Sequence, residues 1–226
     1  MFAADATFAG HVALPDRAAL VAVLAPITGT ARDAMRQATC RAREQLDRLV
    51  RTAGAVRPGS MPEARAAHGA SPASDAATPS RLGQVEVVRR AGADAVRGAF
   101  DRHRRGEQLA DEDVARLALL LEDPAVRDFA WAHTDSGPQS QQLWTEVTRR
   151  AETDQVPAPA CLLAFAAFRS GDGVLARVAL DRALDADPTY SLALLLSEVL
   201  RRGIHPSVFN DLLPVAPDTA NQPDHQ

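Results

Sequence analysis

The chain has 226 residues, 46% of them hydrophobic, which is enough for one large or two small domains with a buried core. Its longest apolar runs fall well short of the roughly 20 residues that cross a bilayer. No basic segment precedes an apolar stretch at the start, so we expect no secretion signal and a cytoplasmic protein. The net charge of −4 argues against broad binding of nucleic acid or anionic lipid.

All 25 basic residues are arginine, a bias that we attribute to a high-GC bacterial genome and not to a functional need for arginine. The two cysteines, Cys40 and Cys161, lie in segments predicted as separate helices. In a reducing cytoplasm we expect both to be buried or half-buried thiols, not a disulfide.

Helical patterns begin in the N-terminal segment, which we take as residues 1–56. A short helix is predicted from Asp16 to Leu24. A second helix begins near Thr30, whose hydroxyl can cap it, and its small and apolar residues recur at helical spacing up to Gly54. One face of this second helix is therefore predicted to be buried.

The composition then changes twice along the chain. Residues 57–80 are rich in Pro, Ser, Ala and Gly and show no apolar period, so they are predicted to be a disordered linker. Helical periodicity returns over residues 81–213, and residues 214–226 are expected to be a disordered tail. Since no segment has a persuasive strand pattern, the sequence predicts an all-α protein.

The C-terminal segment consists of helical patterns separated by Gly and Pro. The acids Asp111 to Asp113 suit the first turn of a helix, and Pro124 suits the start of the next. The stretch from Cys161 to Phe168 is apolar almost all round, so its helix is expected to be central. Further helices are predicted at residues 85–105, 111–121, 124–131, 139–151, 174–183 and 192–200.

The run GDGVLA, residues 171–176, fits the dinucleotide-binding pattern G-x-G-x-x-G/A. That site needs a strand before the run and another after its helix, whereas the flanking patterns here are helical. We therefore favour a tight turn between two helices, in which Gly171 takes the positive φ, over nucleotide binding.

The same region fits a tetratricopeptide hairpin better, because that unit needs small residues where two antiparallel helices touch and a proline after the second helix. The match covers one repeat, and Ala164 and Ala167 depart from the pattern of its first helix. The matching positions are Leu163, Gly171, Gly173, Ala176, Leu180, Ala183 and Pro188. We expect a helical array with this hairpin in its C-terminal half.

Longer stretches resemble a known family. The runs VRDFAWA (residues 126–132) and LLAFAAFRSGDGVLARVALDRALDADPTYSLA (162–193), followed by GIHP (203–206), look like the C-terminal half of the actinobacterial domain-of-unknown-function family 4192 (DUF4192). The stretch GHVALPDRAAL (10–20) is similar to the point where that family passes from its first half to its second. The resemblance implies a fold and no established activity, and it implies that the family's first half is missing here.

Patterns typical of catalysis or metal binding do not occur. The six His residues are scattered, with no H-E-x-x-H and no G-x-S-x-G, and the two Cys residues form no cluster. We therefore predict no catalytic residue, no cofactor and no metal. Arg127 and Asp128 beside Trp131 are a candidate recognition cluster, although an arginine that holds two helices together is the favoured explanation.

The sequence thus favours a non-catalytic scaffold or interaction module that holds a peptide, a partner chain or a second copy of itself. The competing hypothesis is a nucleotide-binding or enzymatic subunit whose active site requires the missing first half. We expect neither nucleic acid nor a membrane as a partner. The predicted partner contacts are exposed polar groups, namely Arg127, Arg177, Asp181 and Tyr190.

Overall fold

The computed structural model describes residues 16–55 and 78–204. These residues form helices and the turns between them, with no strand in either range, so the prediction of an all-α protein is confirmed. The predicted tail, residues 214–226, and most of the predicted linker, residues 57–80, lie outside the described residues.

The N-terminal segment forms two helices, as predicted. Helix α2 (Arg17–Val23) is capped by Asp16, whose carboxylate accepts a hydrogen bond from the backbone N of Ala19 at 2.8 Å. Helix α3 (Gly29–Ala55) is 27 residues long and begins one residue before Thr30, so Thr30 lies inside the helix that it was expected to cap.

Helix α4 (Thr78–Arg104) begins earlier than predicted. Residues 78–80, assigned to the linker from their composition, form its first turn. Pro79 is compatible with this turn, because the first N–H groups of a helix have no partner within it. The helix ends before Gly106, which has φ +72° in the left-handed region that favours glycine.

Three shorter helices and one 3-10 turn follow: α5 (Asp111–Leu120), α6 (Pro124–His133), α7 (Pro138–Arg150) and η1 (Thr153–Gln155). The starts of α5 and α6 agree with the sequence signals, since α5 carries three acids in its first turn and α6 begins with proline. Helix α7 begins at Pro138, one residue before the predicted start.

The last three described helices are α8 (Pro157–Arg169), α9 (Gly173–Ala186) and α10 (Ser191–Arg201). Helix α8 is buried along nearly its whole length, as its continuous apolar run predicted. It packs against α7, α9 and α10, so this helix forms the centre of the C-terminal half.

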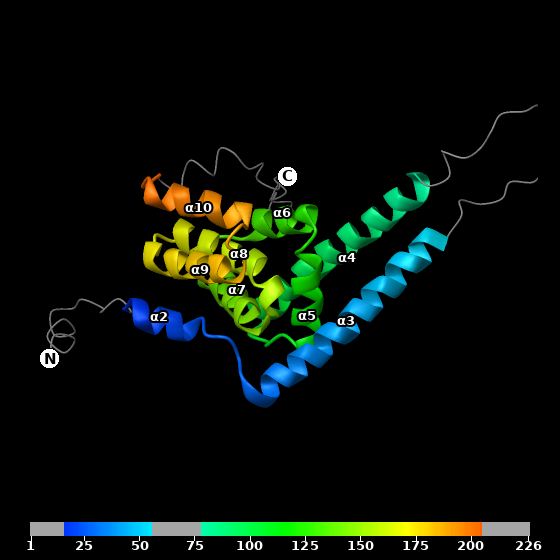
Figure 1. The fold of residues 1–226 in the computed structure, drawn as a ribbon, viewed down its shortest axis with the longest axis horizontal. Helices are drawn as coiled ribbons and strands as arrows, with labels where there is room; N and C mark the ends of the chain where they lie inside the picture. Colours follow the sequence, from blue (N-terminus) through cyan, green and yellow to red (C-terminus); the bar gives the residue numbers. More distant parts are fainter. Residues whose placement is uncertain (1–15, 56–77, 205–226) are drawn as a thin grey trace, which may run out of the picture.

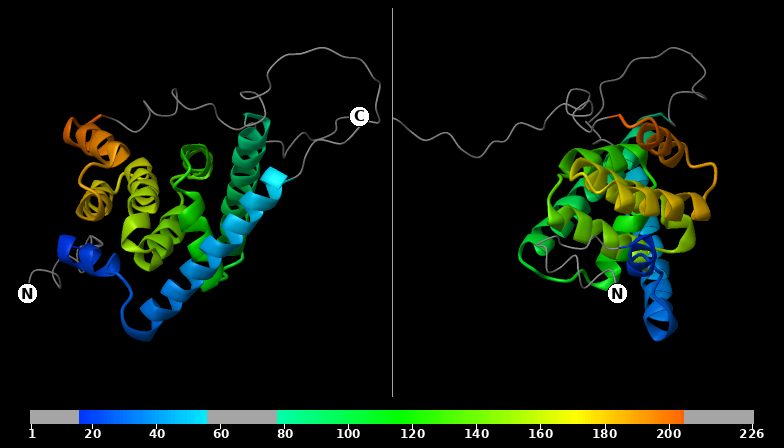
Figure 2. Two further views of the ribbon diagram at one scale, coloured as in Figure 1. Left: turned by 45° about the vertical axis from the view of Figure 1, so that its right-hand side comes forward. Right: turned by 90° about the vertical axis from the view of Figure 1, so that its left-hand side faces the viewer.

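Figure 1 shows the long helices α3 and α4 on one side, α7 to α10 on the other, and α5 and α6 between them. Figure 2 shows the same succession from two further directions, with α2 beside α9 at the far end from α4. A single hydrophobic cluster joins these layers, from Leu24 and Met35 in the N-terminal segment to Phe165 and Leu196 in the C-terminal half. The helices on the two sides of residues 56–77 therefore share one core.

Aromatic side chains fix the middle of this core. Trp131 of α6 stacks on Phe165 of α8 with ring centroids 3.8 Å apart. Trp144 of α7 is fully buried, and its indole N–H donates to the hydroxyl of Thr134 at 2.9 Å. Both tryptophans therefore hold α6, α7 and α8 in a fixed arrangement.

The two cysteines differ in their surroundings. Cys161 is buried in α8, and desolvation raises the pKa of its thiol to about 12. Cys40 is exposed on α3, which corrects the expectation that both thiols would be at least half-buried.

Candidate functional site

A groove of about 740 Å³ lies along one face of α7. Helix α7 forms its floor. Helix α2 with its connection to α3 forms one wall, and the end of α4 with the loop to α5 forms the other. We call this hollow the α7 groove; its lining includes Leu20, Val23, Ile27, His103, Gln142 and Arg149.

The wall formed by α2 is apolar, and hydrogen bonds join its two ends to helices α9 and α7. Val23 is 49% exposed where it lines the groove. At one end of α2, Nη2 of Arg17 donates to Oδ2 of Asp181 in α9 at 2.8 Å. At the other, the backbone N of Ile27 donates to the carbonyl O of Arg149 at 3.1 Å. These contacts hold an apolar surface open toward the floor of the groove.

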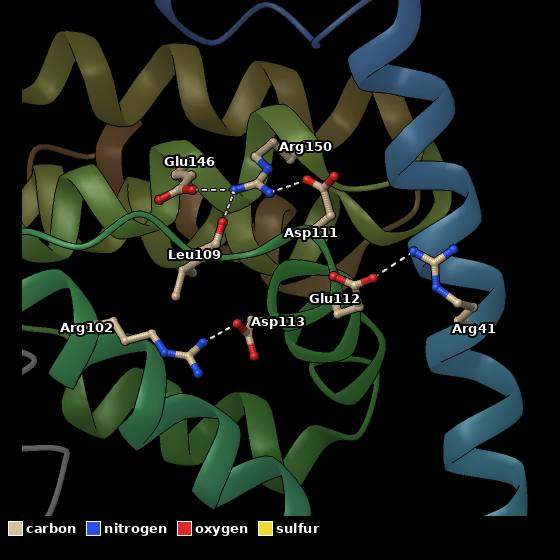
Figure 3. Close-up of polar contacts among 8 residues, drawn as sticks. All are labelled: Arg41, Arg102, Leu109, Asp111, Glu112, Asp113, Glu146 and Arg150. Carbon is tan, nitrogen blue, oxygen red and sulfur yellow. Dashed lines mark hydrogen bonds and ion pairs between the residues drawn. The ribbon is translucent and has the colours of Figure 1, made fainter.

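The opposite wall is held by Arg150, whose side chain is 16% exposed. Its guanidinium donates to the carbonyl O of Leu109 at 2.8 Å and to the carboxylates of Asp111 and Glu146 (Figure 3). One side chain of α7 thus binds the loop before α5 and the first residue of α5. Charge-assisted bonds of this kind are stronger than neutral ones, especially when they are shielded from water.

His103 of α4 faces the same end of the groove. Its Nδ1 lies 3.9 Å from Oε2 of Glu146, and the two side chains are only 11% and 19% exposed. Within the described residues this Nδ1 has no hydrogen-bond partner. This nitrogen is itself buried beside Glu146, so the His103 ring contributes to the wall of the groove and does not present its Nδ1 to an occupant.

The three acids that begin α5 each pair with an arginine from a different helix (Figure 3). Beyond the pair of Asp111 with α7, Glu112 accepts from Nη2 of Arg41 in α3 at 2.7 Å, and Asp113 accepts from Arg102 in α4. The bond from Arg41 lowers the pKa of the Glu112 carboxyl. These acids stand at a helix start, as the sequence suggested, and they also tie α3, α4 and α7 to α5.

Arg127 and Tyr190 lie together, but they are not the exposed groups that the sequence predicted. The Arg127 side chain is 22% exposed, and its Nη1 donates to the hydroxyl of Tyr190 at 3.2 Å. Burial raises the pKa of Tyr190, although the bond from Arg127 opposes that shift. The neighbouring Trp131 is occupied by its stack on Phe165. Arg127 thus links α6 to the turn before α10.

Arg177 and Asp181 also lie close together, one turn apart on the surface of α9. Nε of Arg177 is 3.9 Å from Oδ1 of Asp181, and the two side chains are 51% and 41% exposed. Asp181 is the residue that binds Arg17 of α2. This predicted pair therefore lies behind the apolar wall of the α7 groove and not among its lining residues.

The GDG run forms a turn between two packed helices, α8 and α9. Gly171 has φ +83°, and the carboxylate of Asp172 caps α9 by accepting from the backbone N of Leu175 at 2.8 Å. Gly173 is the first residue of α9. Pro188 directly follows Asp187, the C-cap residue of that helix. The strand that a dinucleotide-binding loop would need before Gly171 is replaced by helix α8.

Two further features concern residues 16–55 and 78–204 only. No three His, Cys, Asp or Glu side chains gather there as metal ligands would. None of the helices in these ranges combines the length and the apolar character needed to cross a membrane.

A family model described as "Domain of unknown function (DUF4192)" matches the chain over residues 1–78 and 60–207. The chain belongs to this family. No curated protein and no solved structure matches it. The match also covers residues 1–9, which precede the stretch GHVALPDRAAL.

The description of DUF4192 assigns no activity, so the function of this member is argued from its own residues. Sequence reasoning missed the α7 groove, although it predicted a helix over residues 139–151. The signal was present in the opposite face of the helix, which carries Gln141, Gln142 and Thr145 where charged residues are commoner on a solvated surface. Nothing local to that run indicated that α2 would lie beside it.

Proposed function

We propose that this DUF4192 protein is a non-catalytic helical interaction module that holds a segment of a partner chain in the α7 groove. The observation that carries the proposal is the composition of that groove, in which the apolar wall of α2 faces the polar floor of α7. Peptide recognition needs both parts, because apolar side chains supply affinity and polar groups fix the register of the bound backbone.

The size and the fixed walls of the groove both suit ligand binding. A volume of about 740 Å³ falls in the range of roughly 300 to 1,000 Å³ that is typical of ligand sites. Its walls are held by the contacts of Arg17, Ile27 and Arg150, so little ordering would be needed on binding.

The ionisable groups of the groove favour binding over catalysis. Glu146 accepts from Arg150, and Glu107 accepts from Nε of Arg105 at 2.7 Å, so each carboxylate already has a cationic partner. The bond from Arg105 lowers the pKa of the Glu107 carboxyl, which disfavours its use as a general base.

Two further proposals concern the α8–α9 hairpin and the cellular compartment. The α8–α9 hairpin is a tetratricopeptide-like unit, which is supported by the small buried residues Ala176 and Ala183 at its helix contact. The setting is the cytoplasm, which suits a protein whose two cysteines are both free thiols.

The test is a selection from a displayed library of random twelve-residue peptides on the full chain, followed by binding to two tryptophan variants. Gln142→Trp fills the α7 groove, whereas Gln37→Trp places the same side chain at an exposed position of α3 outside it. Selected peptides are expected to bind the wild type and Gln37→Trp equally and to lose at least tenfold in affinity for Gln142→Trp. Peptides that bind both variants equally, or a selection that enriches nothing, would contradict the proposal.

A nucleotide titration provides the opposite outcome. If ATP or NAD stabilises the protein against heat and Gly173→Val abolishes this effect, the protein is a nucleotide-binding subunit and not an interaction module. We expect neither nucleotide to raise the melting temperature.

A further inference from the structure

The charges around the α7 groove are unevenly compensated. Its two acidic lining residues, Glu107 and Glu146, each accept hydrogen bonds from an arginine. Arg150 in turn has three acceptors. These groups therefore leave little net charge for an occupant to meet.

Arg149 is the exception among the cations that line the groove. It lies in the last turn of α7, is exposed, and makes no ion pair with any described residue. Its Nε donates to the carbonyl O of Ala25 at 3.2 Å, and this contact places the guanidinium beside the connection from α2 to α3. Its two terminal nitrogens donate to no atom of the described residues. One positive charge is thus presented next to the apolar wall.

One further polar group of the groove has unused hydrogen-bonding capacity. Gln142 is exposed on the floor, and its amide has no partner within residues 16–55 and 78–204. The Nδ1 of His103 on the opposite wall is buried, so it is not available to an occupant. A side-chain amide can donate to a C=O group and accept from an N–H group of an extended peptide.

We infer that the α7 groove selects a peptide segment in which an apolar side chain lies close to a carboxylate, the apolar group packing on Val23 and Ile27 and the carboxylate binding Arg149. This inference rests on the proposed function and adds the chemistry of the partner. An arginine can bind a carboxylate through two parallel N–H···O bonds, which fixes orientation as well as charge. A lysine or arginine at the same place in the ligand would be repelled.

The experiment compares two pools of fluorescein-labelled nonapeptides, each with a central leucine. The flanking positions are drawn from Ala, Ser, Asp and Glu in the acidic pool and from Ala, Ser, Lys and Arg in the basic pool. Fluorescence polarisation with the full chain is expected to show at least tenfold tighter binding of the acidic pool. Arg149→Gln should remove most of this difference, and Arg149→Glu should reverse it.

A matched variant separates a local contact from a general effect of charge. Arg48→Glu makes the same change of charge at an exposed position of α3 that does not line the groove. It is expected to leave the preference intact. An equal loss in Arg48→Glu and Arg149→Glu would overturn the inference, because the preference would then come from the overall field of the protein.

The remaining outcomes distinguish this inference from the function on which it rests. Equal binding of both pools, lost in both cases with Gln142→Trp, would overturn the acidic preference while supporting the groove as the binding site. Tighter binding of the basic pool, if Gln142→Trp abolishes it, would likewise overturn the acidic preference and support the groove as the binding site. Failure of both pools to bind at any concentration up to the solubility limit would contradict both the inference and the proposed function.

Discussion

Gly92 of α4 packs directly against the side chain of Val126 in α6. A Cβ atom at Gly92 would lie 2.3 Å from Cγ2 and 2.6 Å from Cγ1 of Val126, which is closer than two carbon atoms can approach. Val126 is buried and β-branched, so it has little freedom to move away. The contact between α4 and α6 therefore requires the absence of a side chain at residue 92.

Gly92→Ala is expected to lower the free energy of unfolding by about 1 to 3 kcal/mol, the usual cost of overpacking a core, despite the better helix propensity of alanine. Urea unfolding measures this. Gly98→Ala in the same helix is the control, because a Cβ there meets no atom within 4 Å. It should stabilise the protein by up to about 1 kcal/mol. A stabilising Gly92→Ala would show that α4 and α6 do not meet as described.

Arg150 should matter more to stability than Arg41, although both pair with an acid in the first turn of α5. Arg150→Met removes three bonds and leaves Glu146, 19% exposed, without its cation, so we expect a loss of about 2 to 4 kcal/mol. Arg41→Met removes one bond between exposed side chains and should cost much less. Equal losses in thermal or urea unfolding would contradict the role given to Arg150.

The turn at residues 171–173 makes opposite predictions for its two glycines. Gly171→Ala forces a Cβ into the left-handed region and should cost about 1 kcal/mol. Gly173→Ala meets open space at the first position of α9, so it should be neutral or slightly stabilising. Calorimetry on the two variants checks this order. The reverse order would contradict the turn geometry.

The two thiols should react at very different rates. Cys40 is exposed, whereas Cys161 is buried with a pKa raised to about 12, so it stays protonated and shielded at about pH 8. A colorimetric thiol reagent should therefore detect one cysteine in the folded protein and two in denaturant. In Cys40→Ser the rapid reaction should disappear. A rapid reaction that persists in this variant would mean that α8 is not buried.

The same thiol sets the sign of a pH effect. Folding favours the protonated form of Cys161, so unfolding releases a proton between the ordinary thiol pKa and the raised value of about 12. Its contribution to stability is present below the ordinary thiol pKa and is lost as pH rises toward 12. Cys161→Ala should therefore show a shallower decline of stability with alkaline pH than the wild type.

The sequence predicted most helices because each carries a local signal. Pro124 and the acids from Asp111 to Asp113 lie at helix starts, and the apolar run from Cys161 to Phe168 is central. The start of α4 was missed, because the composition of residues 57–80 indicates a linker whereas the last three of them continue into a helix. Local composition cannot show that a following helix has extended backward by one turn.

The candidate site was beyond the reach of local patterns for a different reason. The α7 groove depends on α2 lying beside α7, and these helices are more than a hundred residues apart in the chain. Arg149 and Arg150 look alike in sequence, yet Arg150 has three acceptors and Arg149 has no ion pair among the described residues. Glu146 lies four residues before Arg150 and is a local partner, but Asp111 and Leu109 are brought to Arg150 only by the fold.

Hydrogen exchange of the full chain with and without a selected peptide tests the central claim most directly. We predict slower exchange in the floor of the α7 groove at residues 138–150, in the connection at residues 24–28 and in the loop at residues 105–110, and no change in residues 170–175 of the α8–α9 turn. Protection confined to that turn, or to α10, would contradict the account.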